Sequence, residues 1–140
     1  MTRNYHYIGC FFPREKLLSC AESVSEGHLF RIIETPHITF VFEPGEVDEL
    51  LFGEKIKVKV TGYGNDGRNE GFRVEPYSEN RKLQTMIDNI PVPHITISVA
   101  KGARPYRTRF LEFHPIEPFE LDGIFGGYIE GGTVVCSKPE

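Results

Sequence analysis

The 140-residue chain is 39% hydrophobic and 12% aromatic, which is enough apolar material for a buried core and excludes an intrinsically disordered protein. Its net charge of −4 argues against binding a long nucleic acid along a broad basic surface. No apolar run is long enough to cross a membrane and the N-terminus lacks a signal-peptide pattern, so we expect a single domain, residues 1–140, in the cytoplasm.

In chain order, the first elements predicted are a strand, a helix and an extended segment. Tyr5–Phe12 is rich in aromatic and β-branched side chains, which favours a strand. Apolar residues recur at helical spacing through Pro13–Glu26, and Gly27 suits the left-handed end of that helix. Leu29–Ile33 is expected to be extended, and Glu46–Phe52 is expected to form a short helix.

The middle of the chain predicts a hairpin followed by a second helix. Lys55–Gly62 alternates apolar residues with lysines and a threonine, as a half-buried strand with one wet face does. Gly64–Gly71 is predicted to be a loop that returns the chain into a partner strand at Phe72–Glu75. Asn80 suits the N-cap of an amphipathic helix, which Pro91 ends.

The C-terminal tail and an internal repeat indicate the fold class. Phe119–Cys136 carries short apolar runs separated by glycines, which predicts several antiparallel strands joined by tight turns. An amphipathic helix, a short connection and the residues Pro-His-Ile-Thr occur twice in this order. This weak repeat predicts an α+β fold of two related halves. Cys10, Cys20 and Cys136 lack the spacing of a disulfide framework or zinc site, so we expect free thiols.

The two Pro-His-Ile-Thr motifs, Pro36–Thr39 and Pro93–Thr96, carry the candidate chemistry. Side chains alternate between the faces of a strand, so His37 and Thr39 are expected to share one face. By the same rule, the second motif is expected to present His94, Thr96 and Ser98 together, with the intervening apolar residues in the core. Each strand would then offer an imidazole and a hydroxyl to one surface.

These residue types suit phosphodiester cleavage, which needs a base for the attacking oxygen and an acid for the leaving oxygen. Two imidazoles, with an ordinary pKa near ~6.5, can hold opposite protonation states near neutral pH. Threonine hydroxyls can donate hydrogen bonds to the non-bridging phosphate oxygens, whose charge must be stabilised in the transition state. We therefore expect a site that needs neither a metal nor another cofactor.

The paired motifs resemble those of the two-histidine phosphoesterase superfamily, which includes RNA 2′,3′-cyclic phosphodiesterases, 2′-5′ RNA ligase-like proteins and cyclic phosphodiesterase domains of tRNA ligases. The resemblance implies a bilobal α+β fold, with two pseudo-symmetric lobes of antiparallel sheet plus helices around a central cleft. It implies catalytic roles for His37 and His94 and phosphate binding by Thr39 and Thr96. The implied substrate is an RNA end or a cyclic nucleotide, and no obligate protein partner is evident.

Several alternatives stay open on the sequence alone. Within the enzyme class, the chain would cleave or join a 2′-5′ linkage, or trim an RNA 3′ end. Outside it, the same cleft would bind a phosphorylated nucleotide or RNA end without turnover. A third alternative is that the histidines and threonines of both motifs have no function and only form the solvated faces of two strands. A metal site with His114 as third ligand is the least favoured, since no glutamate or cysteine lies at a standard ligand spacing from either motif histidine.

A basic stretch just past the second motif supplies further candidates. Lys101, Arg104, Tyr106 and Arg107 are candidate substrate-binding residues, because loops at the end of a motif strand lie near the site; Arg109 follows closely. A solvated loop is the competing interpretation. We expect core packing for Tyr7, Phe11 and Tyr63, and we assign no role to His6, His28 and His114.

Overall fold

The computed structural model describes residues 5–129 and 132–137, which form an α+β arrangement dominated by antiparallel sheet. The strands are β1 (Tyr5–Phe11), β2 (Arg31–Ile32), β3 (His37–Phe42), β4 (Lys55–Asn65), β5 (Asn69–Tyr77), β6 (His94–Val99), β7 (His114–Ile129) and β8 (Thr133–Val135). The α-helices are α1 (Arg14–Glu22) and α2 (Arg81–Asp88), and the 3-10 helices are η1 (Glu49–Leu51) and η2 (Pro105–Phe110).

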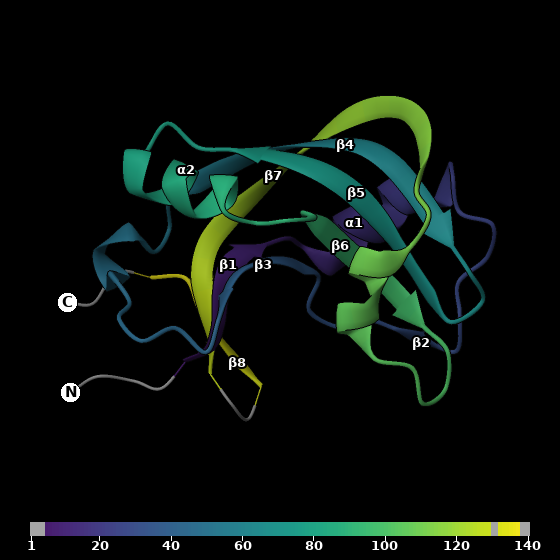
Figure 1. Ribbon diagram of the computed structural model, residues 1–140, viewed down its shortest axis with the longest axis horizontal. Helices are drawn as coiled ribbons and strands as arrows, with labels where there is room; N and C mark the ends of the chain where they lie inside the picture. The colour runs from purple at the N-terminus through teal and green to yellow at the C-terminus, as the bar shows by residue number, and fades with distance from the viewer. Residues whose placement is uncertain (1–4, 130–131, 138–140) are drawn as a thin grey trace.

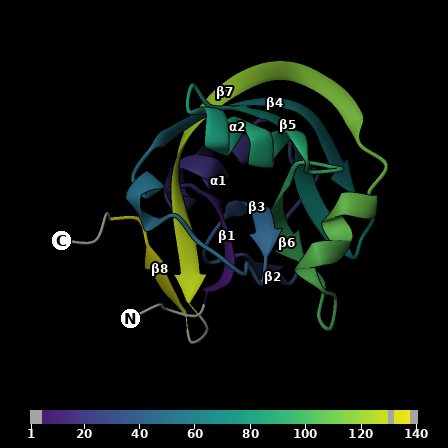
Figure 2. The ribbon, with the colours of Figure 1, turned by 60° about the vertical axis from the view of Figure 1, so that its left-hand side comes forward.

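The strands pair into one sheet in the order β2-β6-β5-β4-β7-β1-β3, with β8 on β7. The motif strands therefore lie near opposite ends of the sheet, β3 at one edge and β6 next to the other edge. The sheet curves strongly, so that β3 and β6 contact each other and lie side by side in both ribbon views (Figures 1 and 2). The curvature brings together two motifs that the pairing order keeps apart.

The two α-helices form where the sequence predicts them, and each buries an apolar stripe. Leu17 and Ala21 are the buried residues of α1, which ends at Glu22, before the predicted end at Glu26. In α2 the Asn80 side chain caps the helix by accepting a hydrogen bond from the backbone N–H of Leu83 at 3.1 Å. That bond satisfies one of the free N–H groups of the first turn.

The hairpin of β4 and β5 is longer than predicted, so the expected loop over Gly64–Gly71 is wrong. Gly64 and Gly71 lie opposite each other in the ladder, and Asn65 still pairs with Glu70. Only residues 66–68 form the turn, where Gly67 has φ of +84° and donates to the Asn65 side chain at 2.9 Å. The glycines at both ends of the predicted loop are strand residues, which composition alone mistook for turn residues.

The tail forms antiparallel strands as predicted, β7 and β8, with Gly132 at φ of +103° just before β8, but the predicted series of several short strands is wrong. The single strand β7 runs from His114 to Ile129 and passes through three of the expected turn glycines. Gly123 is a strand residue, and it is a glycine because its backbone passes so close to Cys10 that a Cβ there would overlap the sulfur. The remaining turn glycine pair includes Gly131, which lies outside the described residues.

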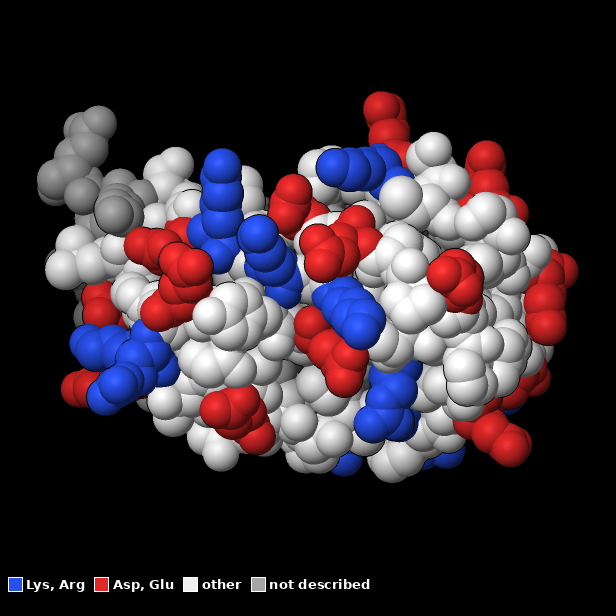
Figure 3. Space-filling view, turned by 90° about the horizontal axis from the view of Figure 1, so that it is seen from above, with Lys and Arg blue, Asp and Glu red and all other residues white. Residues whose placement is uncertain are grey.

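Buried apolar side chains from the sheet, α1 and α2 form a core cluster, and exposed lysines alternate with core residues along β4. Lys55, Lys57 and Lys59 are exposed on β4, as the alternation predicts. Lys57 lies opposite Asp122, and Lys59 lies opposite Glu120. Seen from above, basic and acidic side chains are interspersed on this side of the molecule (Figure 3). No described helix is long and apolar enough to span a membrane, and the three cysteines are free thiols.

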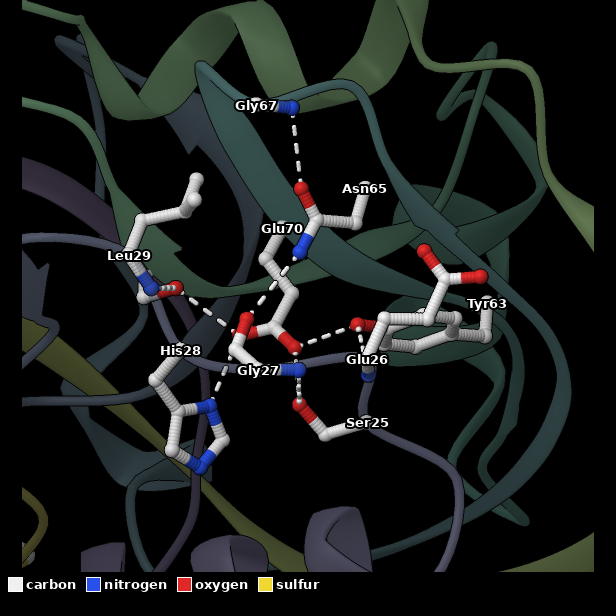
Figure 4. Close-up of polar contacts among 10 residues, drawn as sticks. Ser25, Glu26, Gly27, His28, Leu29, Tyr63, Asn65, Gly67 and Glu70 are labelled. Carbon is white, nitrogen blue, oxygen red and sulfur yellow. Dashed lines mark hydrogen bonds and ion pairs between the residues drawn. The ribbon is translucent and has the colours of Figure 1, made fainter.

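A buried carboxylate fastens the loop after α1 to the sheet. Glu70 on β5 accepts hydrogen bonds from Ser25 and Tyr63 at 2.5 Å each and from His28 and Ser98 at 2.8 Å each (Figure 4). Burial alone would raise the pKa of Glu70, but these four donors hold it below its ordinary value. His28, for which the sequence analysis assigned no role, is therefore a structural residue.

Candidate active site

The two motifs are held in the sheet in equivalent ways. On β3, His37 lies opposite Phe11, and the Pro36 carbonyl accepts a hydrogen bond from the N–H of Phe12 at 3.2 Å. On β6, His94 lies opposite Arg73, and the Pro93 carbonyl accepts from the N–H of Val74 at 3.1 Å. Each proline, which has no N–H of its own, stands just before its strand begins and still joins the ladder through its carbonyl.

Both imidazoles are oriented by a backbone carbonyl two residues earlier. The Nδ1 atom of His37 lies 2.9 Å from the Thr35 carbonyl oxygen, and that of His94 lies 2.8 Å from the Val92 carbonyl oxygen. A carbonyl oxygen only accepts, so Nδ1 carries the proton in each ring and the neutral ring keeps Nε2 as its proton acceptor. The repeated motif therefore fixes the same tautomer twice.

His37 is enclosed by aromatic rings. The Tyr7 ring stacks on it with centroids 4.3 Å apart, and the Tyr7 hydroxyl lies 3.3 Å from Nδ1. The pKa of His37 is lowered to about 4, chiefly by burial; the hydrogen bond to the Thr35 carbonyl acts in the opposite direction, and the charge of His94 adds to the lowering. The effect of His94 on His37 means that the two imidazoles lie within electrostatic reach of each other.

His94 has a different neighbourhood. Burial lowers its pKa, the hydrogen bond to the Val92 carbonyl raises it, and the positive charge of Arg109 lowers it again. Arg109 belongs to η2, the short helix that follows β6. His94 thus lies beside a permanent cation, whereas His37 is enclosed by Tyr7 and Phe11.

A cavity of about 490 Å³ lies between β3, the connection from α2 to β6, and η2. Its wall combines polar groups of the motifs with apolar side chains: Thr39, Phe40, Phe42, Asn89, Ile90, Pro91, Val92, His94, Tyr106 and Arg109. Among the described residues, no carboxylate lines it. His37 does not line this cavity, although Thr39 from the same strand does. The structure therefore gathers one motif hydroxyl, one motif imidazole and one guanidinium around a common space.

The two motif threonines differ sharply in their contacts. Thr39 is half-buried, and its hydroxyl has no hydrogen-bond partner within the described part of the chain. Thr96 is only 9% exposed, and its hydroxyl bonds with the Pro105 carbonyl at 3.1 Å and the Thr108 hydroxyl at 2.8 Å. Only Thr39 keeps a hydroxyl that is free to meet a ligand.

No family model and no curated protein sequence matches this chain.

The expected common face of His94, Thr96 and Ser98 is wrong at Ser98. The β5–β6 register shifts there, so that Glu70 and Gly71 on β5 oppose Ser98 and Thr96 on β6, leaving one extra residue on β6. Such a bulge turns the following side chain to the other face. Ser98 consequently bonds with Glu70 in the interior, while Thr96 bonds with η2.

The structure separates the residues of the basic stretch. Tyr106, which is 55% exposed, reaches the cavity beside His94. Arg104 and Arg107 line a second cavity of about 340 Å³, also bordered by Tyr106 and by the β4–β5 turn. Lys101 is exposed in a turn and borders neither cavity.

Sequence reasoning missed one residue of the site and did not single out another. Arg109 was noted only as following the basic stretch, and it lines the cavity from the 3-10 helix η2. Tyr7 was correctly expected to be buried, and the strand pattern gave no sign that its ring stacks on His37. Across the described residues, no three His, Cys, Asp or Glu side chains come together as a metal site.

Proposed function

We propose that this protein is a metal-independent phosphoesterase that opens 2′,3′-cyclic phosphates of RNA ends or nucleotides by acid–base catalysis with two histidines. The observation that carries the proposal is the matched pair of imidazoles, His37 and His94. Each has Nδ1 held by a backbone carbonyl, and the two lie on contacting strands next to a cavity without carboxylates. A pure binding site has no need of two such groups.

In the proposed reaction, His37 is the base and His94 is the acid. A pKa of about 4 keeps His37 neutral near neutral pH, so that it can accept a proton as a water oxygen attacks phosphorus. The bond from phosphorus to one ribose oxygen then breaks, and protonated His94 supplies the proton that this oxygen requires. The products are a ribose monophosphate, a protonated His37 and a neutral His94, and exchange with solvent restores both histidines.

The proposal includes a bilobal organisation of residues 1–140, with β6-β5-β4 as one half of the sheet and β7-β1-β3 as the other. Support comes from the equivalent Pro and His hydrogen bonds of the two motifs. The substrate would be an RNA end or free cyclic nucleotide, handled in the cytoplasm. The interspersed charges of the outer face favour a small phosphate-bearing ligand over a long nucleic acid.

The test is incubation of the purified protein with each of the four nucleoside 2′,3′-cyclic monophosphates, with the products separated by chromatography and identified by phosphorus NMR. We expect conversion to a nucleoside monophosphate. A protein that binds the cyclic nucleotides without converting them would be a binding module, which would contradict the proposal.

A further inference from the structure

Arg109 is a cation without a counter-ion beside the motif residues. It lines the cavity with Thr39 and His94, and within the described residues it makes no ion pair. Its guanidinium carbon lies 4.9 Å from the centre of the ring of the adjacent Phe110. A positive charge in a cavity that no carboxylate lines attracts an anion.

The position of η2, which carries Arg109, depends on a chain of buried hydrogen bonds. A carbonyl oxygen only accepts, so the Thr96 hydroxyl gives its single proton to Pro105, 3.1 Å away. The Thr108 hydroxyl, 2.8 Å from that of Thr96, then donates to Thr96, and the Asn69 amide donates to Thr108 at 3.1 Å. Asn69 also donates to the Arg104 carbonyl at 2.9 Å. Both ends of η2 are thereby fixed to β5 and β6.

The close contact between η2 and the sheet requires a glycine. A Cβ on Gly71 would overlap the Thr108 methyl group and would lie only 2.6 Å from the Ile95 carbonyl oxygen. Gly71 lies opposite Thr96 in the β5–β6 ladder. The absence of a side chain at Gly71 therefore leaves the space that the Thr108 side chain occupies against the sheet.

We propose that Arg109 binds the phosphate in this cavity together with Thr39, and that Thr96 is a positioning residue that holds η2 against β6. The inference rests on the proposed function for the identity of the ligand as a phosphate ester. It departs from the two-fold symmetry that the repeated motif implies. In the first motif strand the threonine itself donates to the phosphate. In the second, the threonine gives its proton to the backbone of η2, and the arginine of η2 takes over that role.

This arrangement couples substrate binding to the protonation of His94. The cations that face His94 are Arg109 from η2, Arg73 opposite it on β5, and His37 on β3 when protonated. A bound phosphate that neutralises the charge of Arg109 removes the repulsion that disfavours a protonated His94, and so raises the pKa of His94. His94 would then become an acid mainly when substrate is bound.

The first experiment measures binding of inorganic phosphate by calorimetry to the wild type, Arg109→Met and Arg14→Met. Arg14 lies on the exposed side of α1, so its replacement is a control for net charge. We expect Arg109→Met to weaken phosphate binding by about 10- to 100-fold, as for a lost charge-assisted hydrogen bond. Arg14→Met should bind like the wild type. NMR titration should show the pKa of His94 raised by Arg109→Met and unchanged by Arg14→Met.

The second experiment separates positioning from direct contact by a double-mutant cycle. Thr96→Val should weaken phosphate binding in the wild-type background and change it by less than about 2-fold in the Arg109→Met background, because coupled residues are not additive. Thr96→Ser, which keeps the hydroxyl, should restore binding. If Thr96→Val does not fold, Thr108→Val breaks the same chain and replaces it in the cycle.

The outcomes are distinct. Equal phosphate affinity of the wild type and Arg109→Met, or no phosphate binding to the wild type, would overturn the role of Arg109. A Thr96→Val loss that persists without Arg109 would make Thr96 a direct phosphate donor and overturn its positioning role. Binding that depends on Arg109, together with no turnover of cyclic nucleotides, would support this site while removing the proposed enzymatic function.

Discussion

The two motif strands have the same four residues and different surroundings. In both, Nδ1 of the histidine donates to the carbonyl two residues earlier, and the proline carbonyl accepts from the neighbouring strand. His37 is then covered by the Tyr7 ring, whereas His94 faces the charge of Arg109. The local motif determines the tautomer, and the tertiary neighbours determine the charge.

The two motif threonines likewise share a local position and differ in their tertiary neighbours. Both follow their histidine by two residues on a strand, but β3 is an edge strand whose Thr39 hydroxyl is free, and β6 is covered by η2, which bonds with Thr96. A duplicated motif therefore gives two geometrically similar halves without making them chemically equivalent.

The largest effects are expected from the histidines themselves. His37→Ala and His94→Ala should each lower turnover of a 2′,3′-cyclic nucleotide by on the order of 10²-fold or more, since a positioned acid or base contributes that much. Steady-state kinetics on folded variants would measure this, with the exposed His114→Ala as a matched control. Near-wild-type turnover in either motif variant would rule out the two-histidine mechanism.

The next effect tests the free hydroxyl of the first motif. Thr39→Val keeps the β-branched shape and removes one donor, so we expect turnover to fall by on the order of 10- to 10³-fold, the range for a lost transition-state donor. The loss should persist in the Arg109→Met background, because in the proposed site Thr39 would contact the phosphate directly. Unchanged turnover would leave Thr39 as a strand former only.

The pH dependence probes the difference between the imidazoles. An ordinary pair would give a bell with both limbs between about pH 5 and 8. Here kcat/KM should fall on the acidic side as His37 becomes protonated, through a pKa of about 4 in the free protein. It should fall on the alkaline side as His94 loses its proton, at a pH below the ordinary value of 6.5, because its pKa is lowered.

Tyr7→Leu sharpens this test by opening only the first half of the site. The tyrosine ring contributes to the burial of His37, so its removal should raise the pKa of His37 and move the acidic limb upward. The alkaline limb, set by His94, should stay in place. Movement of the alkaline limb alone would reverse the assignment of base and acid.

The sequence predicted the parts of this molecule that depend on local pattern. Alternation located β4, and the Asn80 cap located α2. Glycine was the least reliable signal, because it marks turns at Gly67 but close backbone contacts at Gly71 and Gly123. The order of strands in the sheet depends on long-range pairing, which no local pattern encodes.

The candidate site divides in the same way. Pairing of the two motifs on contacting strands was predictable from their repetition, which suggested related halves. The bulge that turns Ser98 away from Thr96 was not, since it arises from the register with β5. The role inferred for Arg109 also required the path of η2, which begins at Pro105 and turns with three residues per turn.

The smallest expected effect is that of metal removal, and it decides whether the two histidines act as a base and an acid or as metal ligands. If a divalent ion bound both imidazoles, the two histidines would have the same role, that of a metal ligand, and neither would act as a base or an acid. Hard cations such as magnesium prefer carboxylate and carbonyl oxygens, and the cavity side chains are imidazole, hydroxyl, amide, guanidinium and apolar groups. In the proposed mechanism, proton transfer by His37 and His94 and donation by Thr39 would supply what an ion supplies in metal-dependent phosphoesterases. We expect full turnover of a 2′,3′-cyclic nucleotide after exhaustive EDTA treatment, and no stimulation by magnesium or manganese. Loss of activity on chelation, restored by one metal, would show that His37 and His94 act as ligands and that their different surroundings serve another purpose.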